Sequence, residues 1–354
     1  MLDHGGGILA AAHRYGIPLG DWLDLSTGLN PQGWPVPALP ASCWQRLPEE
    51  NDGLEAAAAA YYGSDALLPV AGSQPAIQAL PLLRPRGVVG MLATSYAEHA
   101  HAWQRRGHQV LRLAPDELEA AVDAVDVLLL VNPNNPTGWH APASQLNRWR
   151  ERLAARGGWL VVDEAFMDCT PDNSLLPFIG ATGLVVLRSI GKFFGLAGAR
   201  AGFVFAWPEL LAQLREELGP WTLAGPARQA VKAALQDTAW QHDTRLRLAH
   251  DSARLGAMLR QHSLVPDGSS ALFQWLRHPQ AAVLHDALAR CGVLCRYFAE
   301  SSSLRFGLPA GEADWQRLQA ALAAIGPLLH PEQDSQARPH HVSSAAANDG
   351  ARKG

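Results

Sequence analysis

The sequence predicts an α/β protein with a mostly parallel sheet covered by helices on both faces, and a second, smaller α+β unit. Two observations predict this fold class. Between residues 66 and 206, short apolar runs alternate with longer amphipathic stretches; further along, shorter strand-like runs are separated by helix. Because strands that alternate with helices are joined by right-handed crossovers, the first pattern favours parallel pairing.

Five apolar runs without alternation are typical of strands buried on both faces: Val88–Leu92, Val127–Val131, Trp159–Asp163, Leu184–Leu187 and Gly202–Ala206. Amphipathic helices are expected between them, at Ala97–Arg106 and Ser144–Arg156. Ligands of such sheets bind beyond the carboxyl ends of the strands, so we expect the functional residues there.

Four segments are expected along the chain. Residues 1–40, rich in Gly and Pro, predict an extended arm that joins the small domain, and residues 41–225 the large domain. Residues 226–330 predict the small domain, with elements at Pro226–His262 (helix), Ala271–Leu276, Val293–Tyr297 and Leu304–Leu308 (strands) and Ala313–Leu328 (helix). Residues 331–354 are polar and predict a disordered tail.

Composition and charge exclude several classes of protein. Hydrophobic residues make up 48% of the 354 residues, charged residues 18%, and the formal net charge is −4. This composition is that of a packed globular protein, without the basic excess of a nucleic-acid binder. The longest apolar run is far shorter than the ~18 residues of a membrane span. With no basic-then-apolar segment at the N-terminus, we expect a soluble cytoplasmic enzyme.

The cysteines predict neither a disulfide scaffold nor a metal site. Cys43, Cys169, Cys291 and Cys295 have no paired metal-ligand spacing and are too few to cross-link a chain of this length. We therefore expect reduced thiols and no bound metal.

Residues 188–200, RSIGKFFGLAGAR, follow a predicted strand and are the most informative segment. Lys192 stands among apolar residues, which lower the pKa of an amine and favour a nucleophilic or Schiff-base lysine. Ser189 and Arg200 can offer a hydroxyl and a guanidinium to one phosphate. A surface lysine in a glycine-rich loop is the alternative. A P-loop is excluded, because Val186 and Phe193 occupy its required Gly and Ser/Thr positions.

Two further polar residues follow predicted strands. Asp163 closes one strand, and a buried carboxylate needs a positive partner, such as a protonated pyridine nitrogen; a helix-capping acid is the alternative. Asn135 lies in NPNNPTG, where two Asn-Pro steps fix an irregular turn that could present its amide to a phenolic oxygen.

Two more segments are candidates for binding an anionic aromatic ligand. Gly72-Ser73-Gln74 precedes a helix whose start is marked by Pro75, and free N–H groups there favour an anion. Tyr96 opens the next strand-to-helix turn and could lie against an aromatic cofactor. A plain helix cap and a core aromatic residue are the alternatives.

The order of these residues resembles that of the pyridoxal-phosphate (PLP) enzymes with the aspartate aminotransferase fold, fold type I. The strings NPNNPTG, DEAF and S-x-x-K…R are signatures of that family, and the resemblance runs from His4 to about Leu329. It implies a mostly parallel seven-stranded sheet, a homodimer and PLP. It also implies that Lys192 binds the cofactor covalently and later moves protons, Asp163 pairs with the ring nitrogen and Asn135 contacts the ring oxygen. The remaining implied cofactor contacts are Gly72, Ser73, Gln74, Ser189 and Arg200 around the phosphate and Tyr96 on the ring.

Within that superfamily, four segments resemble the threonine-phosphate decarboxylases of cobalamin biosynthesis: His4-Gly5-Gly6, residues 23–31 (LDLSTGLNP), residues 220–222 (PWT) and residues 235–241 (LQDTAWQ). This resemblance implies decarboxylation of L-threonine O-3-phosphate to (R)-1-amino-2-propanol phosphate. It places Arg305 at the carboxylate-binding position, where a guanidinium would fix the substrate's rotation. The other implied substrate contacts are His4, Gly5, Gly6 and Asn30.

The chain departs from its relatives at three positions. Phe166 replaces a tyrosine that adds a hydroxyl contact to the ring oxygen, and Gly191 replaces a common Ser or Thr. Leu47 replaces a tyrosine that reaches the neighbouring subunit's cofactor phosphate, and leucine cannot make that contact.

Two rival functions share most of these residues. An aminotransferase for a phosphorylated amino compound such as histidinol phosphate would need nearly the same site. A non-enzymatic PLP-binding regulator usually carries a separate DNA-binding module, for which we expect no room before His4.

Overall fold

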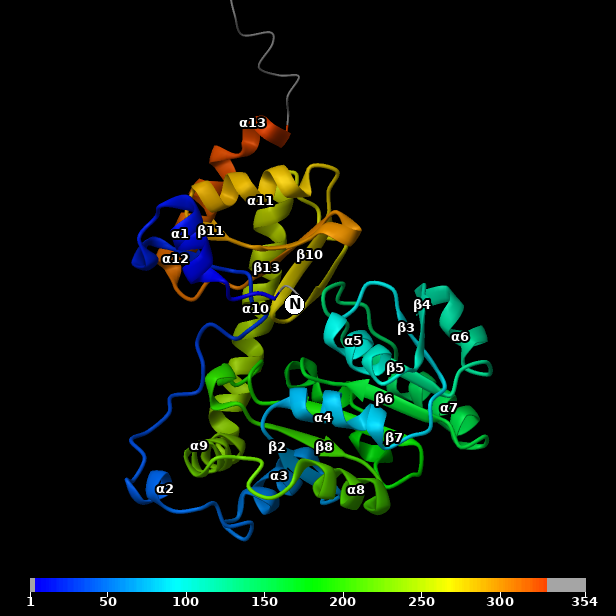
Figure 1. Ribbon diagram of the computed structural model, residues 1–354. Helices are drawn as coiled ribbons and strands as arrows, with labels where there is room; N and C mark the ends of the chain where they lie inside the picture. Colours follow the sequence, from blue (N-terminus) through cyan, green and yellow to red (C-terminus); the bar gives the residue numbers. More distant parts are fainter. Residues whose placement is uncertain (1–3, 330–354) are drawn as a thin grey trace, which may run out of the picture.

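The computed structural model describes residues 4–329. Its larger part is built on a seven-stranded sheet in the order β2-β8-β7-β6-β5-β3-β4 (Figure 1). Neighbouring strands from β7 to β4 are parallel, whereas β8 is antiparallel to β7 and β2. The predicted mostly parallel sheet is confirmed. The strands are β2 (Leu67–Val70), β3 (Val88–Leu92), β4 (Gln109–Leu113), β5 (Val127–Val131), β6 (Trp159–Asp163), β7 (Leu184–Ser189) and β8 (Gly202–Phe205).

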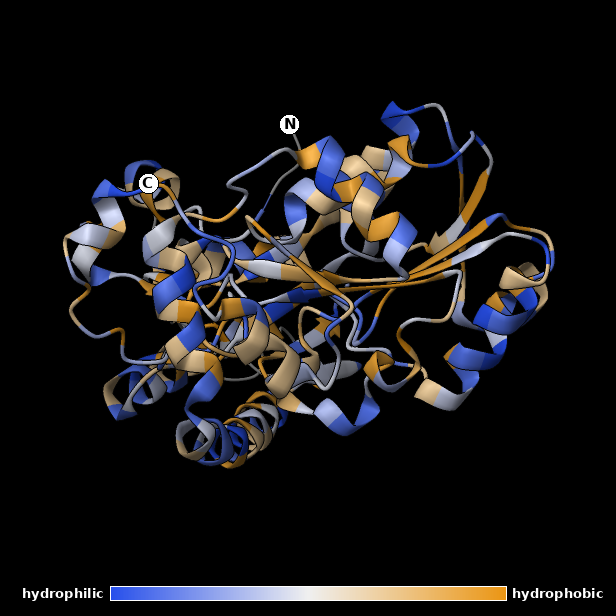
Figure 2. Cartoon of the chain, turned by 90° about the horizontal axis from the view of Figure 1, so that it is seen from below, coloured by the Kyte–Doolittle hydropathy of each residue, from blue (hydrophilic) through white to orange (hydrophobic). Residues whose placement is uncertain are grey.

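Both faces of this sheet are buried, because successive side chains of the central strands enter different clusters. In β5, Leu128 and Leu130 face one cluster, and Val127 and Leu129 face the other. Figure 2 shows the apolar strands lying between layers of helices whose outer faces are hydrophilic. One face is covered by α4 (Ser73–Ala79), α5 (Ala97–Arg105) and α8 (Pro208–Leu218), and the other by α3 (Leu54–Tyr62), α6 (Leu118–Ala121), α7 (Ala143–Ala154), α9 (Gly225–Gln236) and α10 (Thr238–Gln261).

The smaller part contains an antiparallel sheet in the order β12-β13-β10-β9 and a parallel pair, β1 with β11. In Figure 1 it lies above the large sheet, and α10 extends from one part to the other. Its elements are β1 (Leu23–Asp24), β9 (Gly268–Ser270), β10 (Phe273–Arg277), β11 (Val293–Leu294), β12 (Arg296–Phe298) and β13 (Ser303–Gly307), with α1 (Ile8–Tyr15), α11 (Ala281–Arg290), α12 (Glu312–Ala324) and α13 (Gly326–Leu329).

The remaining elements are short. They are α2 (Ser42–Gln45) and the 3-10 turns Leu19–Asp21, Leu80–Leu82, Pro115–Glu117, Met167–Cys169, Pro171–Asn173, Leu176–Phe178, Ala197–Ala199 and Ala299–Ser301.

Several predicted elements are wrong in detail. The predicted extended arm, residues 1–40, is not simply extended within residues 4–40, because the apolar stripe of Ile8–Tyr15 forms α1 against the small part. The tract Pro226–His262 is two helices, since Asp237 leaves the helical conformation and its carboxylate accepts a hydrogen bond from the backbone N–H of Trp240. The run Val293–Tyr297 is two strands that pair in different sheets.

Other predicted elements change less. The last predicted helix is divided into α12 and α13. Strands β2 and β4, at the two edges of the large sheet, were not predicted, because β2 contains Pro69 and β4 alternates polar and apolar residues.

Because α9 packs against α3 of the large part, we propose that the boundary between the two domains lies at Asp237 and not between residues 225 and 226. The predicted tail, residues 331–354, lies outside the described residues. Within residues 4–329, no helix has the length and apolar character needed to cross a membrane.

Candidate active site

The predicted site residues meet where the carboxyl ends of β5, β6 and β7 face the smaller part of the molecule. The register brings Val131 beside Asp163 and Asp163 beside Leu187, so the turns after the three strands are neighbours. From the opposite side, β13 brings Arg305 to the same place, where its guanidinium donates to Oδ1 of Asn135. Residues distant in sequence thus come together at one place between the two parts.

Lys192 lies in the turn after β7 with its amine enclosed. Its Nζ is 5.5 Å from the centre of the Phe166 ring. Burial, helped by the positive charges of Arg305 and Arg200 and opposed by Asp163, lowers the pKa of Lys192 to about 8. A substantial fraction of this amine is therefore neutral near pH 8, the form that attacks a carbonyl.

Asp163, the last residue of β6, is only 3% exposed. Its Oδ1 accepts the backbone N–H of Ala165 at 3.0 Å, and its Oδ2 lies 2.9 Å from Nε2 of His99 on α5. His99 is 1% exposed. The carboxylate is thus held from two sides, and a buried, oriented carboxylate is suited to stabilise a nearby protonated ring nitrogen.

The turn after β5 leaves Asn135 in a defined orientation. Asn132 and Asn134 use their amides within the turn and its surroundings, on Ala141, Thr94 and Thr137. Because Arg305 donates to Oδ1 of Asn135, the Nδ2 group of that amide points elsewhere as a donor. An N–H donor in this position is suited to bind a phenolic oxygen on the ring of a cofactor.

The residues predicted to bind an anion come from three segments, together called the cradle. Gly72 ends the turn after β2, and a Cβ there would lie 2.8 Å from Nη2 of Arg200, so only glycine lets the guanidinium approach. Ser189 closes β7, and Ser73 begins α4. The amide of Gln74 donates to Glu98 at 2.8 Å, which ties the cradle to α5.

Tyr96 immediately precedes α5, and its ring contacts His99 edge to face at 5.9 Å between centres. Burial, with Asp163 and Glu98 as further causes, raises the pKa of Tyr96 to about 12, so its phenol is neutral. The side chain lies beside the Asp163–His99 pair.

The N-terminal segment contacts residues of both parts near this site. His4 lies 2.8 Å from Glu98, measured from Nε2 to Oε1, and Gly5 passes close to the Ser26 carbonyl. The backbone N–H of Gly6 donates to Oγ of Ser26 at 2.7 Å. Asn30, predicted to contact the substrate, is only 3% exposed, and its side chain is bonded to the Phe193 carbonyl and to Arg247.

Comparison with known proteins shows the family of this chain. The model of the family "aminotransferase class I and II" matches residues 47–325. The chain belongs to the aminotransferase class I and II family. It is 56% identical to a threonine-phosphate decarboxylase of Pseudomonas aeruginosa over 330 residues, 93% of this chain and 100% of that protein. It is 41% identical to a threonine-phosphate decarboxylase of a Sinorhizobium species, over 92% of this chain and 98% of that protein.

Solved structures of aminotransferase class I and II relatives share the fold. The histidinol-phosphate aminotransferase from Sinorhizobium meliloti, determined in complex with pyridoxal-5'-phosphate, superimposes with a TM-score of 0.79. That likeness covers 91% of this chain and 95% of the other at 23% identity, so it concerns the fold alone.

The donor set of this family member fits PLP. An amine of lowered pKa, a buried carboxylate and an amide N–H donor match the cofactor's aldehyde, ring nitrogen and ring oxygen, and two hydroxyls with a guanidinium match its phosphate. Nε of Arg305 is buried without a hydrogen-bond partner, which leaves this guanidinium with a donor for a ligand.

Two residues of the site were missed by the sequence reasoning. His99 lies one helical turn after Tyr96, so a stacking Tyr96 already placed position 99 near the site. Arg296 is directly opposite Arg305 in the β12–β13 register. Burial and then the charge of Arg296 lower the pKa of Arg305 to about 10, so the Arg305 guanidinium stays charged at neutral pH. Paired guanidiniums favour a ligand with more than one negative charge.

The departures from aminotransferase relatives have structural counterparts. Phe166 packs edge to face against Phe273 of the small part, at 5.3 Å between ring centres, and contacts the Lys192 amine only through its ring. Leu47 lies in the segment after α2 and is 66% exposed.

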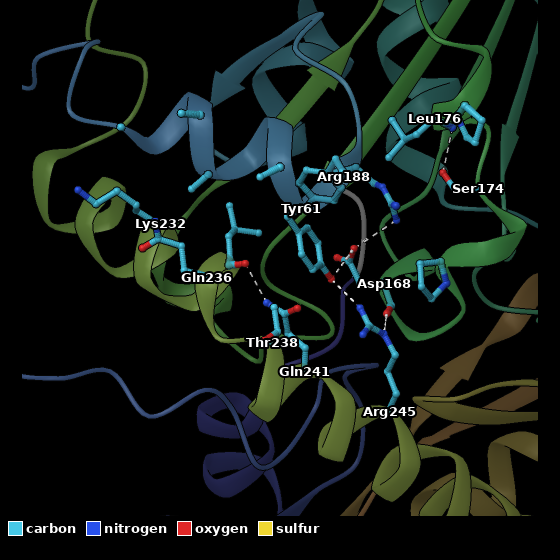
Figure 3. A pocket seen from close by; sticks show the side chains of 18 residues that line it. Tyr61, Asp168, Ser174, Leu176, Arg188, Lys232, Gln236, Thr238, Gln241 and Arg245 are labelled. Atoms are coloured by element: carbon cyan, nitrogen blue, oxygen red, sulfur yellow. Dashed lines mark hydrogen bonds and ion pairs between the residues drawn. The ribbon is translucent and has the colours of Figure 1, made fainter.

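A cavity of about 960 Å³ adjoins the site without being part of it (Figure 3). It lies between α3, α9, the start of α10 and the segment after β6. Two residues that line this cavity contact phenylalanines of the site. The guanidinium carbon of Arg245 lies 5.1 Å from the centre of the Phe193 ring, and the Tyr61 ring contacts Phe194 edge to face. These two phenylalanines directly follow Lys192. The cavity therefore lies behind residues 190–195, the loop after β7 that carries Lys192, which we call the lysine loop. Arg188 spans 3.4 Å to Asp168 at its wall, a buried ion pair that supports this scaffold.

Proposed function

We propose that this protein is a PLP-dependent decarboxylase that converts L-threonine O-3-phosphate to (R)-1-amino-2-propanol phosphate, for cobalamin biosynthesis. The observation that carries the proposal is Arg305, whose charge acts on the Lys192 amine and which lies opposite Arg296 in the sheet, in a chain that is 56% identical to a threonine-phosphate decarboxylase over 93% of its length. The substrate carries a carboxylate and a phosphate, and two guanidiniums match two anionic groups.

The roles proposed for the cofactor contacts follow from their chemistry. Lys192 would hold PLP covalently, Asp163 would pair with its ring nitrogen, and Asn135 would donate to its ring oxygen. Tyr96 would stack on the ring. The phosphate would be bound by the cradle of Gly72, Ser73, Gln74, Ser189 and Arg200. When bound, PLP supplies an electron sink for the electron pair of the broken bond.

The protein's own contribution is to choose the bond and to handle the proton. Arg305, fixed by Ser26 and Asn135, would grip the carboxylate and set the rotation about the substrate's Cα–N bond. The bond that breaks is the one held perpendicular to the ring plane. After CO2 leaves, Cα must take up a proton, and Lys192 is the acid placed to deliver it.

Substrate phosphate contacts are proposed next to the N-terminal segment. Arg296 and His4 would bind the phosphate, since Nη1 of Arg296 on β12 donates to the His4 carbonyl and so brings the two residues together. Gly5 and Gly6 would contribute by letting the backbone pass close to Ser26.

Incubation with L-threonine O-3-phosphate tests the proposed reaction. We expect the PLP-loaded protein to release CO2 and aminopropanol phosphate without a keto-acid acceptor. A requirement for 2-oxoglutarate, with the carboxylate retained in the product, would show transamination instead. Histidinol phosphate with 2-oxoglutarate is the control for that rival, and turnover of this pair alone would overturn the proposal.

We further propose that the protein is a cytoplasmic homodimer. Exposed apolar side chains occur together in the segment before α3, at Val36, Trp44 (70% exposed) and Leu47, and such groups commonly mark a protein interface.

Light scattering on the purified protein tests the dimer. We expect the mass of two chains for the wild type and of one chain for Trp44→Glu. Val283→Glu, which changes an exposed apolar residue on α11, should remain dimeric. A wild type that is monomeric at micromolar concentration would contradict this proposal.

A further inference from the structure

The lysine loop is held from outside by the segment 30–34, which belongs to the N-terminal part of the chain. Three successive carbonyls of the loop accept hydrogen bonds from this segment. The Lys192 carbonyl accepts the backbone N–H of Asn30 at 3.0 Å, and the Phe194 carbonyl accepts that of Trp34 at 2.8 Å. Between them, the Phe193 carbonyl accepts Nδ2 of Asn30 at 2.9 Å.

The two segments are in close backbone contact. Gly195 has a φ of +67°, and a Cβ there would lie 2.6 Å from Cα of Gly33 and 2.8 Å from the Asn30 carbonyl. Any other residue at 195 would push the segment away. The lysine loop therefore has little freedom to move without breaking contacts with residues 30–34.

The direction of the Asn30 amide is fixed by its other end. Its Oδ1 accepts Nη2 of Arg247 on α10 and the backbone N–H of Gln32, both at 3.0 Å. Arg247 is itself 3.5 Å from Asp251, one turn further along α10. With Oδ1 occupied in this way, Nδ2 of Asn30 faces the Phe193 carbonyl.

The same segment is joined to the small part just before Asn30. The Leu25 carbonyl accepts the backbone N–H of Gly307 at 2.7 Å, and the Ser26 carbonyl accepts Nη2 of Arg305 at 2.8 Å. Residues 25–34 thus connect the strand that carries Arg305 with the loop that carries Lys192.

We propose that Asn30 is a positioning residue for Lys192: its amide, oriented by Arg247, fixes the backbone of the lysine loop and thereby the place of the Lys192 amine relative to Arg305. Asn30 therefore acts through Lys192 and not by touching the substrate. The effect of Asn30 on catalysis rests on the proposed function, whereas its effect on the position of the Lys192 amine does not.

The first test is made on the cofactor-free protein. The Lys192 amine is titrated by measuring, from pH 6 to 11, how fast an acylating reagent modifies the Lys192 peptide, with mass spectrometry as readout. Removal of the Asn30 amide should loosen the loop and hydrate the amine, whose neighbours are Asp163, Arg200 and Arg305. We expect the midpoint in Asn30→Ala to rise toward the value of an ordinary lysine.

A second measurement uses the loaded enzyme with L-threonine O-3-phosphate. Asn30→Ala should lower kcat by about 10- to 100-fold, the effect of a displacement of about 1 Å at a reacting group, and change KM little. Asn30→Asp keeps the acceptor for Arg247 and Gln32 but cannot donate to the Phe193 carbonyl. It should fold and show the same fall in kcat.

Gln241→Ala is the matched control. Gln241 is another buried amide that donates to two backbone carbonyls, those of Ala234 and Leu235, neither of which belongs to the lysine loop. Gln241→Ala should lose about as much stability as Asn30→Ala, but the pH midpoint of Lys192 acylation should not shift. The proposal is overturned if Asn30→Ala and Gln241→Ala shift the midpoint equally, or if Asn30→Asp alone shifts it, since an added charge would then be the cause. A wild type that leaves L-threonine O-3-phosphate unchanged would overturn the proposed function, while the titration would still decide the role of Asn30.

Discussion

Replacement of Lys192 by alanine is expected to lower turnover by at least about 10³-fold while leaving the fold intact. The variant loses the amine that would hold the cofactor and return the proton to Cα. The surrounding residues keep their hydrogen bonds in this variant, because the lysine loop is held through its backbone carbonyls and not through the Lys192 side chain. Circular dichroism and light scattering should therefore match the wild type, whereas CO2 release from L-threonine O-3-phosphate should be nearly abolished.

The wild-type protein allows a direct check of the same residue. After PLP is added, borohydride reduction should leave the cofactor on the Lys192 peptide. Since only the neutral amine attacks an aldehyde and the pKa of Lys192 is about 8, the rate of capture should fall as the pH drops below 8 and level off above it. Lys232, whose amine donates to the Asp52 carbonyl on another face, serves as the control. Lys232→Ala should capture PLP normally, and a label on Lys232 in place of Lys192 would refute the assignment.

Arg305→Ala is expected to have the second-largest effect. It removes the guanidinium proposed to bind the carboxylate, and it also removes the donor to the Ser26 carbonyl and to Asn135. A lost charge-assisted pair of about 3 kcal/mol corresponds to a fall in kcat/KM of about 10²-fold. Because rotation about the Cα–N bond would no longer be fixed, we also expect a larger share of transamination relative to decarboxylation.

Two companion variants make the Arg305 result specific. Arg305→Lys keeps the charge but loses the planar fork, so it should recover only part of kcat/KM. Arg277→Ala removes an exposed arginine at the end of β10 that pairs with Asp267, the residue just before β9, and it should leave the kinetics unchanged. Unchanged kinetics and product ratio in Arg305→Ala would rule out the proposed carboxylate contact.

The central strands of the large sheet could be predicted from the sequence because they are buried on both faces. The apolar runs of β3, β5 and β6 match the predicted ranges residue for residue. The edge strands were missed for the opposite reason: one contains Pro69 and the other alternates, so neither has the signal of a buried strand. The N-terminal helix was missed because Gly and Pro around it hide its short apolar stripe.

The cofactor contacts could be proposed because each follows a strand, where the topology itself brings residues together. Residues that depend on tertiary contacts could not be placed in this way. The role of Asn30 depends on Arg247, more than 200 residues away in the chain, and no local pattern connects them. Arg296 becomes informative only through the strand register that sets it opposite Arg305.

The pairing of β1 with β11 has a consequence for how the protein is made. Leu23 and Leu25 reach their partners only in the segment 292–307, close to the end of the described chain. At about 5–20 residues per second, the ribosome needs on the order of 10–50 s to synthesise what lies between them. Throughout that interval the first strand has left the ribosome without a partner. The large sheet, complete by residue 205, can form in the meantime, and the N-terminus joins the fold last although it is made first.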